Sequence, residues 1–187
     1  MNLINKKEDL NLNHVIDPSK DCIKYIKSSN EKEFTRHSYS DSVVRANFGD
    51  FLISIIFNTN SIEKTIFIVN KFLEKTASPE KIQFCIKIDN DDAIFENNFL
   101  KEMSKFEFNF VILSSPKGRG FIDLWQWINF LFYASSKHSK FIMNISDEMY
   151  VEEEDWDNNL ESYKNLEDDN IYRLRTSVYR NRNYHDL

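Results

Sequence analysis

Two adjacent acids, Asp147 and Glu148, follow the apolar segment 140–146 (KFIMNIS). Neighbouring carboxylates repel each other unless water, hydrogen bonds or a hard cation neutralises them. Oxygen ligands at the end of a buried strand suit Mg²⁺ or Mn²⁺ holding a diphosphate, because such ions keep several waters and share their remaining positions with phosphate oxygens. The alternative is structural: Asp147 caps the following turn and Glu148 points into water.

A second acidic cluster, 89–92 (DNDD), follows the apolar segment 81–88 (KIQFCIKI). An acid at the end of a second strand commonly accepts hydrogen bonds from a ribose hydroxyl in nucleotide-binding α/β domains. Asp and Asn clusters also form Asx turns and helix caps. The sequence leaves both interpretations of Asp89 and Asp91 open.

A basic glycine-bearing turn, 116–120 (PKGRG), precedes the apolar segment 121–136. Backbone N–H groups at a helix N-terminus, with Lys117 and Arg119 beside them, can bind an anion. The P-loop pattern GxxxxGK[ST] is absent, and Gly-x-Gly alone is a weak signal. A plain turn explains the segment as well as an anion site does.

Alternating strands and helices must position these residues. The continuous apolar run 51–57 (FLISIIF) predicts a strand buried on both faces, and 61–76 predicts an amphipathic helix that begins at Ser61. Further strands are predicted at 81–88, 106–114 and 140–146, with helices ending near Met103 and spanning 121–136. This alternation predicts an α/β fold with a mostly parallel sheet and helices on both faces. Thr59, Asp89, the 116–120 turn and Asp147 should then converge at one sheet edge.

The chain of 187 residues fits one domain with an extension. Residues 1–49 are a polar extension, in which Asp17-Pro18-Ser19 predicts the start of a short helix over the apolar positions 22–26, and residues 50–187 form the domain. Residues 170–187 suggest one more strand and a basic tail. The aromatic residues of 121–136 recur at helical spacing and are predicted to belong to the core: Trp125, Trp127, Phe130, Phe132 and Tyr133.

Composition excludes several classes of protein. A net charge of −6 gives no general attraction to nucleic acid or anionic lipid. Two cysteines without zinc-site spacing provide neither a disulfide framework nor a zinc site, so we expect a reducing, cytoplasmic setting. No apolar run approaches the ~20 residues of a membrane span, and no signal peptide is evident. No serine, cysteine or histidine motif for a nucleophile can be named.

Four segments resemble, in order and spacing, the nucleotide-sugar-binding half of family 2 glycosyltransferases of the GT-A (Rossmann-like) fold. They are ISIIFNTNS (53–61), KIDNDD (87–92), SPKGRGFIDLWQWINF (115–130) and KFIMNISDEMYVEEEDWDNNL (140–160), and the resemblance covers roughly residues 50–165. It implies that the turn 58–60, with Thr59, corresponds to the family's first strand end. It also implies that Asp89 is the best candidate for the acid that holds the base.

The family's DXD motif and the acid-Trp pair that follows it correspond to 146–148 (SDE) and 155–156 (DW). The resemblance implies that Asp147 faces the ribose and diphosphate while Glu148 ligates Mn²⁺ or Mg²⁺. Ser146 stands where the family has the first acid of this motif, and Glu148 stands where the family has an aspartate. The implied activity is transfer of a sugar from a nucleoside-diphosphate donor, UDP-sugar favoured, to a saccharide or other glycan acceptor. The predicted site comprises Thr59, Asp89, Asp91, Arg119 and Asp147 for the nucleotide sugar, and Glu148 with Asp147 for the metal.

The resemblance stops before the acceptor side, so we expect the domain to be truncated there and assign no catalytic base. A non-catalytic GT-A-like module that binds a nucleotide or glycan is therefore the main alternative. A third, less favoured interpretation is nucleotidyl transfer with Mg²⁺ at the acid pair; the segment 58–64 lacks the glycine-rich basic signature expected for it. The sequence gives no indication of the oligomeric state.

Overall fold

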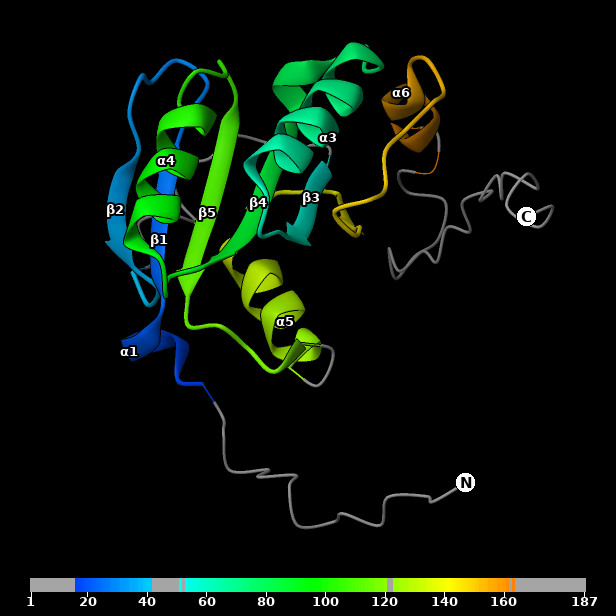
Figure 1. The fold of residues 1–187 in the computed structure, drawn as a ribbon. Coiled ribbons are helices and arrows are strands. Elements are labelled where there is room, and N and C mark those ends of the chain that lie inside the picture. The colour runs from blue at the N-terminus through cyan, green and yellow to red at the C-terminus, as the bar shows by residue number, and fades with distance from the viewer. Residues whose placement is uncertain (1–15, 42–50, 52, 121–122, 162, 164–187) are drawn as a thin grey trace, which may run out of the picture.

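A six-stranded mixed sheet forms the centre of the protein, with strand order β2-β1-β5-β4-β3-β6 (Figure 1). The computed structural model describes residues 16–41, 51, 53–120, 123–161 and 163. Four strands are parallel: β3 (Ile53–Asn58), β4 (Ile82–Asp89), β5 (Asn109–Ser115) and β6 (Phe141–Asn144). Two antiparallel strands, β1 (Ile23–Lys27) and β2 (Thr35–Ser38), extend the sheet beyond β5.

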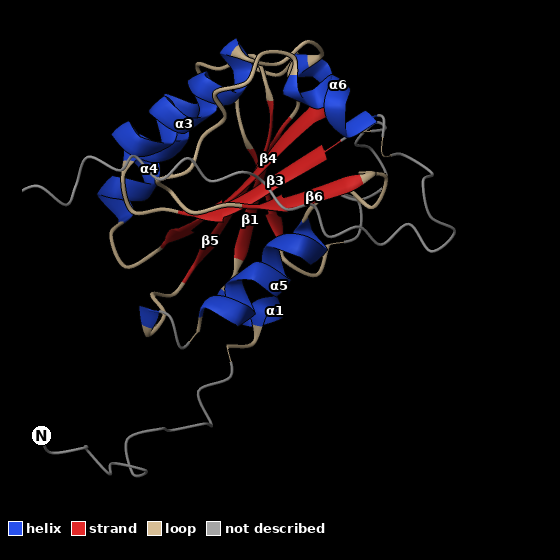
Figure 2. Cartoon of the chain, turned by 90° about the vertical axis from the view of Figure 1, so that its right-hand side faces the viewer, coloured by secondary structure: helices blue, strands red, loops and turns tan. Residues whose placement is uncertain are grey.

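Helices cover both faces of this sheet, as Figure 2 shows. One face carries α3 (Ile62–Glu74), α4 (Ala93–Met103) and α6 (Trp156–Glu161), and the other carries α5 (Leu124–Ala134) and the one-turn α1 (Pro18–Asp21). A 3₁₀ turn, η1 (Pro79–Lys81), leads into β4. The predicted α/β class, with a mostly parallel sheet between helices, is confirmed.

Side-chain caps explain where α3 and α4 begin. The Ser61 hydroxyl accepts a hydrogen bond from the Lys64 backbone N–H at 3.3 Å, which confirms the predicted helix start. The Asp92 carboxylate accepts hydrogen bonds from the backbone N–H groups of Ile94 and Phe95 at 2.9 and 3.0 Å. The capping interpretation therefore holds for Asp92, the last acid of the 89–92 cluster.

The predicted helix over positions 22–26 is wrong. Helix α1 spans only Pro18–Asp21, and Ile23–Lys27 is a strand that pairs antiparallel with β5. Cys22 and Ile26 point to one face and Tyr25 to the other, so the apolar positions follow the period of a strand. Pairing with β1 also satisfies the outer backbone edge of β5. Strands β1 and β2 thus belong to the same sheet as the strands that follow residue 50.

Two apolar cores lie on the two faces of the sheet. The core under α3, α4 and α6 includes Phe57, Phe72, Phe84, Phe99, Phe110 and Trp156. The core under α5 includes Ile56, Cys85, Val111, Leu113, Trp127 and Leu131. Burial raises the pKa of both thiols, that of Cys22 to about 12, so Cys22 and Cys85 act as small apolar packing groups.

The aromatic side chains of α5 divide between the inside and the outside. Trp127 is buried, at 3% exposure, and Phe130 packs partly against it. The prediction of core positions is wrong for Trp125, Phe132 and Tyr133, which are 59%, 51% and 57% exposed. Positions 125, 132 and 133 are separated by seven and eight residues and therefore share the helix face turned away from the sheet.

The additional strand and basic tail predicted at 170–187 lie outside the described residues, as do residues 1–15 of the extension. Within the described part of the chain, no helix has the length and apolar character needed to cross a bilayer.

Candidate functional site

A change in the direction of strand order locates the candidate site. From β3 the chain adds β4 and then β5 on one side, and it then returns through α5 to place β6 on the other side of β3. Numbered along the chain, the parallel strands lie in the order third, second, first, fourth, as in dinucleotide-binding sheets. Ligands of such sheets bind beyond the carboxyl ends of the strands at this switch point, which here lies between β3 and β6.

A cleft of about 610 Å³ occupies this position. Its lining comes from the ends of β3, β4 and β6, from the turn before α5, from the first half of α5 and from the segment after β6; it includes Asn58, Lys87, Asp89, Lys117, Gly118, Trp127, Asn144, Asp147 and Glu148. Ligand sites in proteins commonly measure about 300–1,000 Å³. The fold thus brings the predicted Asp89, Asp147 and Glu148 to one cleft.

Lys87 is a cleft residue that the sequence analysis missed. It is 4% exposed, its ammonium group contacts the Asp89 carboxylate, and it lies 4.5 Å from the centre of the Trp127 ring. An ammonium group over an indole face is attracted by the ring's quadrupole. The available signal was spacing, since residues two apart in a strand share a face, which puts Lys87 beside Asp89.

The glycine turn is shaped by contact with the same tryptophan. A Cβ atom on Gly118 would lie 2.6 Å from Nε1 of Trp127, so any larger residue would force the turn and the indole apart. Gly120 has φ +66°, a left-handed conformation that favours glycine. These two positions hold the turn against α5 and leave Lys117 at the cleft.

Arg119 is engaged within the turn and is not among the residues that line the cleft. Its Nη2 lies 2.7 Å from Oδ1 of Asp123, and its backbone N–H donates to Oδ2 of the same carboxylate at 2.7 Å. The hydrogen bond from the Arg119 side chain lowers the pKa of the buried Asp123 to about 2. Gln126 donates to Oδ1 of Asp123 and accepts from the Ile16 backbone N–H. This network fastens the turn, α5 and the segment before α1 together.

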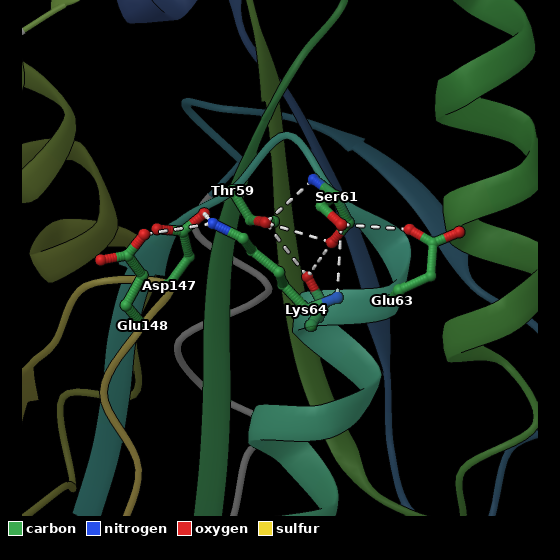
Figure 3. A network of polar contacts seen from close by, with 7 residues as sticks. Thr59, Ser61, Glu63, Lys64, Asp147 and Glu148 are labelled. Carbon is green, nitrogen blue, oxygen red and sulfur yellow. Dashed lines mark hydrogen bonds and ion pairs between the residues drawn. The ribbon is translucent and has the colours of Figure 1, made fainter. Parts of the chain in front are cut away.

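Two other predicted residues do not line the cleft. Thr59 is 6% exposed, and its hydroxyl accepts a hydrogen bond from the Ser61 backbone N–H at 3.1 Å within the β3–α3 turn (Figure 3). Its neighbour Asn58 reaches the cleft instead. Asp91 is exposed and is not part of the lining.

The acid pair faces a lysine from α3 (Figure 3). Nζ of Lys64 lies 3.3 Å from Oε1 of Glu148 and 3.7 Å from Oδ2 of Asp147. The side chains of Lys64, Glu148 and Asp147 are 48%, 76% and 26% exposed, so water also screens their charges. The ammonium group thus neutralises part of the charge of the two carboxylates.

Asp147 and Glu148 offer two carboxylates, so a divalent cation held there would take its remaining ligands from water or from a substrate phosphate. Asp147 and Glu148 already share the Lys64 ammonium group, and no group of three or more His, Cys, Asp or Glu that could hold an ion occurs in the described ranges. A divalent cation would have to compete with Lys64 for the same carboxylate charge.

The acid-Trp segment after the pair anchors the backbone. Trp156 packs edge-to-face on Phe72 with ring centres 5.4 Å apart, and its Nε1–H donates to the Phe72 carbonyl at 3.4 Å. The Asp157 carboxylate accepts from the backbone N–H groups of Ala77 and Ser78, both at 2.8 Å. These contacts fasten the segment after β6 to the far end of α3.

Comparison with protein-family models, with curated proteins and with solved structures finds no match to this chain.

Proposed function

We propose that the cleft binds the nucleoside diphosphate part of a nucleotide sugar and that the protein is a GT-A-like glycosyltransferase. The observation that carries the proposal is the meeting of three separate sequence motifs at one switch-point cleft. Asp89 comes from the end of β4, Lys117 from the glycine turn and Asp147 from the segment after β6. These are the segments on which the resemblance to family 2 glycosyltransferases depends.

The charges around the cleft suit the two ends of such a donor. Asp89 offers carboxylate oxygens to the N–H and O–H donors of a base and ribose. Lys117 offers an ammonium group to phosphate oxygens, and Lys87, which is paired with Asp89, adds positive charge from a largely desolvated position. During sugar transfer, negative charge develops on the leaving diphosphate, and fixed ammonium groups in the cleft would stabilise it.

In this proposal the acid pair acts together with Lys64. Asp147 borders the cleft and is available to ribose or sugar hydroxyls, while Lys64 neutralises part of its charge and that of Glu148. The expectation of Mn²⁺ or Mg²⁺ requires the ion to compete with this lysine.

Isothermal titration calorimetry with UDP and GDP, each with Mn²⁺ and with EDTA, tests the donor site. We expect UDP to bind with a Kd on the order of micromolar, which corresponds to about 8 kcal/mol of binding free energy. Lys87→Met should weaken this binding, whereas Lys101→Met, on the exposed surface of α4, should not. Absence of binding to either nucleotide under all four conditions would overturn the proposal.

A second candidate function is a module that binds the nucleotide without transferring sugar. The contact between Lys64 and the acid pair favours it, because both carboxylates that could act at the reacting centre share one ammonium group. Incubation with UDP-glucose, UDP-galactose and UDP-N-acetylglucosamine, with a set of saccharide acceptors, separates the two functions. Release of UDP with formation of a glycoside supports the transferase, and donor binding without turnover supports the module.

A further inference from the structure

We propose that the indole N–H of Trp127 donates a hydrogen bond to a diphosphate oxygen of the bound nucleotide. This role rests on the proposed donor function, since the diphosphate would lie in the same cleft. Trp127 lies near the start of α5 and lines the cleft, although only 3% of its surface is exposed. It is therefore a buried polar side chain at the wall of the candidate site.

The indole nitrogen of Trp127 lacks a hydrogen-bond partner. Within the described part of the chain, no group accepts a hydrogen bond from its Nε1–H. Trp156, which is buried on the other face of the sheet, instead donates its Nε1–H to the Phe72 carbonyl at 3.4 Å. A buried tryptophan usually finds such a partner, because an unpaired donor costs free energy. An unpaired N–H at the wall of a cleft thus indicates a contact that a ligand completes.

The glycine turn passes the edge of the ring that carries this nitrogen. A Cβ atom on Gly118 would lie 2.6 Å from Nε1 and 3.0 Å from Cζ2 of Trp127, so a side chain at this position would cover the N–H group. Gly118 and its neighbour Lys117 both line the cleft. The turn therefore leaves the indole edge uncovered and holds a lysine next to it.

Positive charge on this side of the cleft favours an anion as the acceptor. Lys117 has no acidic partner among the residues that the structure describes, so its charge is available to a ligand. The Lys87 ammonium group lies 4.5 Å from the centre of the indole ring and neutralises Asp89. A diphosphate carries several acceptor oxygens, so one oxygen can accept from the indole N–H while another contacts Lys117.

The indole ring is held in place before any ligand binds. Phe130 packs edge-to-face against Trp127, with ring centres 5.6 Å apart and planes at 72°, and Lys87 lies over the ring face. A donor fixed by packing needs little reordering on binding, which preserves the energy of the hydrogen bond. It would also stabilise the charge that develops on a leaving diphosphate.

Nitrogen-15 NMR of the full chain tests the contact, because the three tryptophans give three indole N–H signals. Trp125→Phe and Trp156→Phe identify two of these signals, and the remaining one belongs to Trp127 without any change at the site. The protein is titrated with inorganic pyrophosphate, with UDP and with uridine. We expect pyrophosphate and UDP to move the Trp127 proton signal downfield and uridine, which lacks phosphate, to leave it in place. The signals of Trp125 and Trp156 serve as internal controls.

A variant of Trp127 measures how much the N–H contributes to affinity. Trp127→Phe keeps an aromatic ring and removes the donor, so it should weaken binding of pyrophosphate and UDP about tenfold, as loss of a hydrogen bond to a charged group commonly does. Trp156→Phe removes a similarly buried indole, 6% exposed, from the other face of the sheet and is the matched control. Isothermal calorimetry measures the affinities, and thermal unfolding checks that both variants fold. Equal loss of affinity in the two variants would contradict a specific role for Trp127.

The outcomes distinguish this contact from the proposed function. A Trp127 signal that moves with pyrophosphate and UDP, together with the loss of affinity in Trp127→Phe, supports the contact. UDP binding that leaves the signal in place, or a signal that moves further with uridine than with pyrophosphate, overturns the contact and leaves the donor site standing. A signal that responds to pyrophosphate in a protein that binds neither UDP nor GDP supports the anion contact but overturns the donor function. Absence of binding to pyrophosphate, UDP and GDP overturns both.

Discussion

The two faces of strands β3 and β4 bury different kinds of side chain. On the face under α3 and α4, these strands bury only apolar side chains, such as Ile55, Phe57 and Phe84. On the face under α5, the same strands bury Ser54, Gln83 and Lys87 among apolar neighbours. Because successive residues of a strand point to opposite faces, one sequence builds both surfaces at once.

This difference indicates that one face of the sheet mainly stabilises the fold, whereas the other face also carries the candidate site. The apolar face can be packed tightly without polar groups to satisfy. The α5 face satisfies only part of its polar groups: the Gln83 carbonyl oxygen accepts from the Ser54 hydroxyl and from the Ser136 backbone N–H, both at 2.9 Å, while the Gln83 amide nitrogen has no partner among the described residues. The candidate cleft opens at the end of this second face, where Lys87, Asp89 and Trp127 meet. Substitutions on the two faces should therefore affect different measurements.

The largest effect on stability is expected on the apolar face. Phe84 is fully buried and contacts the rings of Phe72 and Phe110, with ring centres 6.2 and 5.7 Å away. Phe84→Ala should lower the free energy of unfolding by about 3–5 kcal/mol, because it removes apolar contacts and leaves a cavity. Urea unfolding followed by circular dichroism measures this change. A loss below about 1 kcal/mol would contradict the assignment of this face as the main core.

On the α5 face, the largest effect on stability is expected at Asp123. Asp123→Asn should lower the free energy of unfolding by about 2 kcal/mol, since the Arg119 guanidinium group loses its charged partner. For a chain of this size this corresponds to a fall in Tm of roughly 4–8 °C. Asp91→Asn, at an exposed position, is the control and should stay within about 0.5 kcal/mol of the native protein.

The pH dependence of the Asp123 contribution follows from its pKa. Folding lowers this pKa from 3.8 to about 2, so the unfolded chain holds the proton more tightly than the folded protein does. The stabilisation is present above pH 3.8 and is lost as the pH falls toward 2. The stability difference between the native protein and Asp123→Asn should therefore shrink between pH 5 and pH 2.5. A difference that stays constant over this range would show that the charge of Asp123 does not stabilise the fold.

Lys87 should affect binding more than stability. Lys87→Met keeps an unbranched side chain of similar size but removes the ammonium group that contacts Asp89 and the Trp127 ring. We expect the Kd for UDP to rise about tenfold, a loss of about 1.4 kcal/mol. Unchanged UDP affinity in Lys87→Met would place the phosphates away from this face of β4.

The smallest effect is expected at Lys64. Lys64→Met should strengthen Mn²⁺ binding by a few fold, because exposed ion pairs contribute at most about 1 kcal/mol and the freed carboxylates become available to the metal. Titration with Mn²⁺ alone, followed by the water proton relaxation rate, measures this affinity. Lys71→Met, on the same helix, is the control. Equal affinities in all three proteins would show that Lys64 does not compete with a cation.

Much of the framework could be predicted because its signals are local. The apolar runs of β3 and β4 and the Ser61 cap depend on neighbouring residues, and the predicted elements agree with the structure there. The strands at the β1 edge of the sheet were harder to predict from the sequence. Positions 22–26 carry too few residues to separate the helical period from the strand period, and the backbone partner that selects a strand is β5, far along the chain.

The sequence by itself determined that polar residues end the parallel strands, because an apolar run buried inside a sheet must stop where the chain meets water. Only the tertiary structure decided which of those residues meet. The partner of Asp147 and Glu148 is Lys64, more than eighty positions away, and that contact exists because β6 lies beside β3. The pair Arg119 and Asp123, by contrast, is a local contact between residues four positions apart, and the fold adds the burial of the Asp123 carboxylate. Local patterns set the period and burial of each element, whereas contacts between distant side chains depend on which elements pack together.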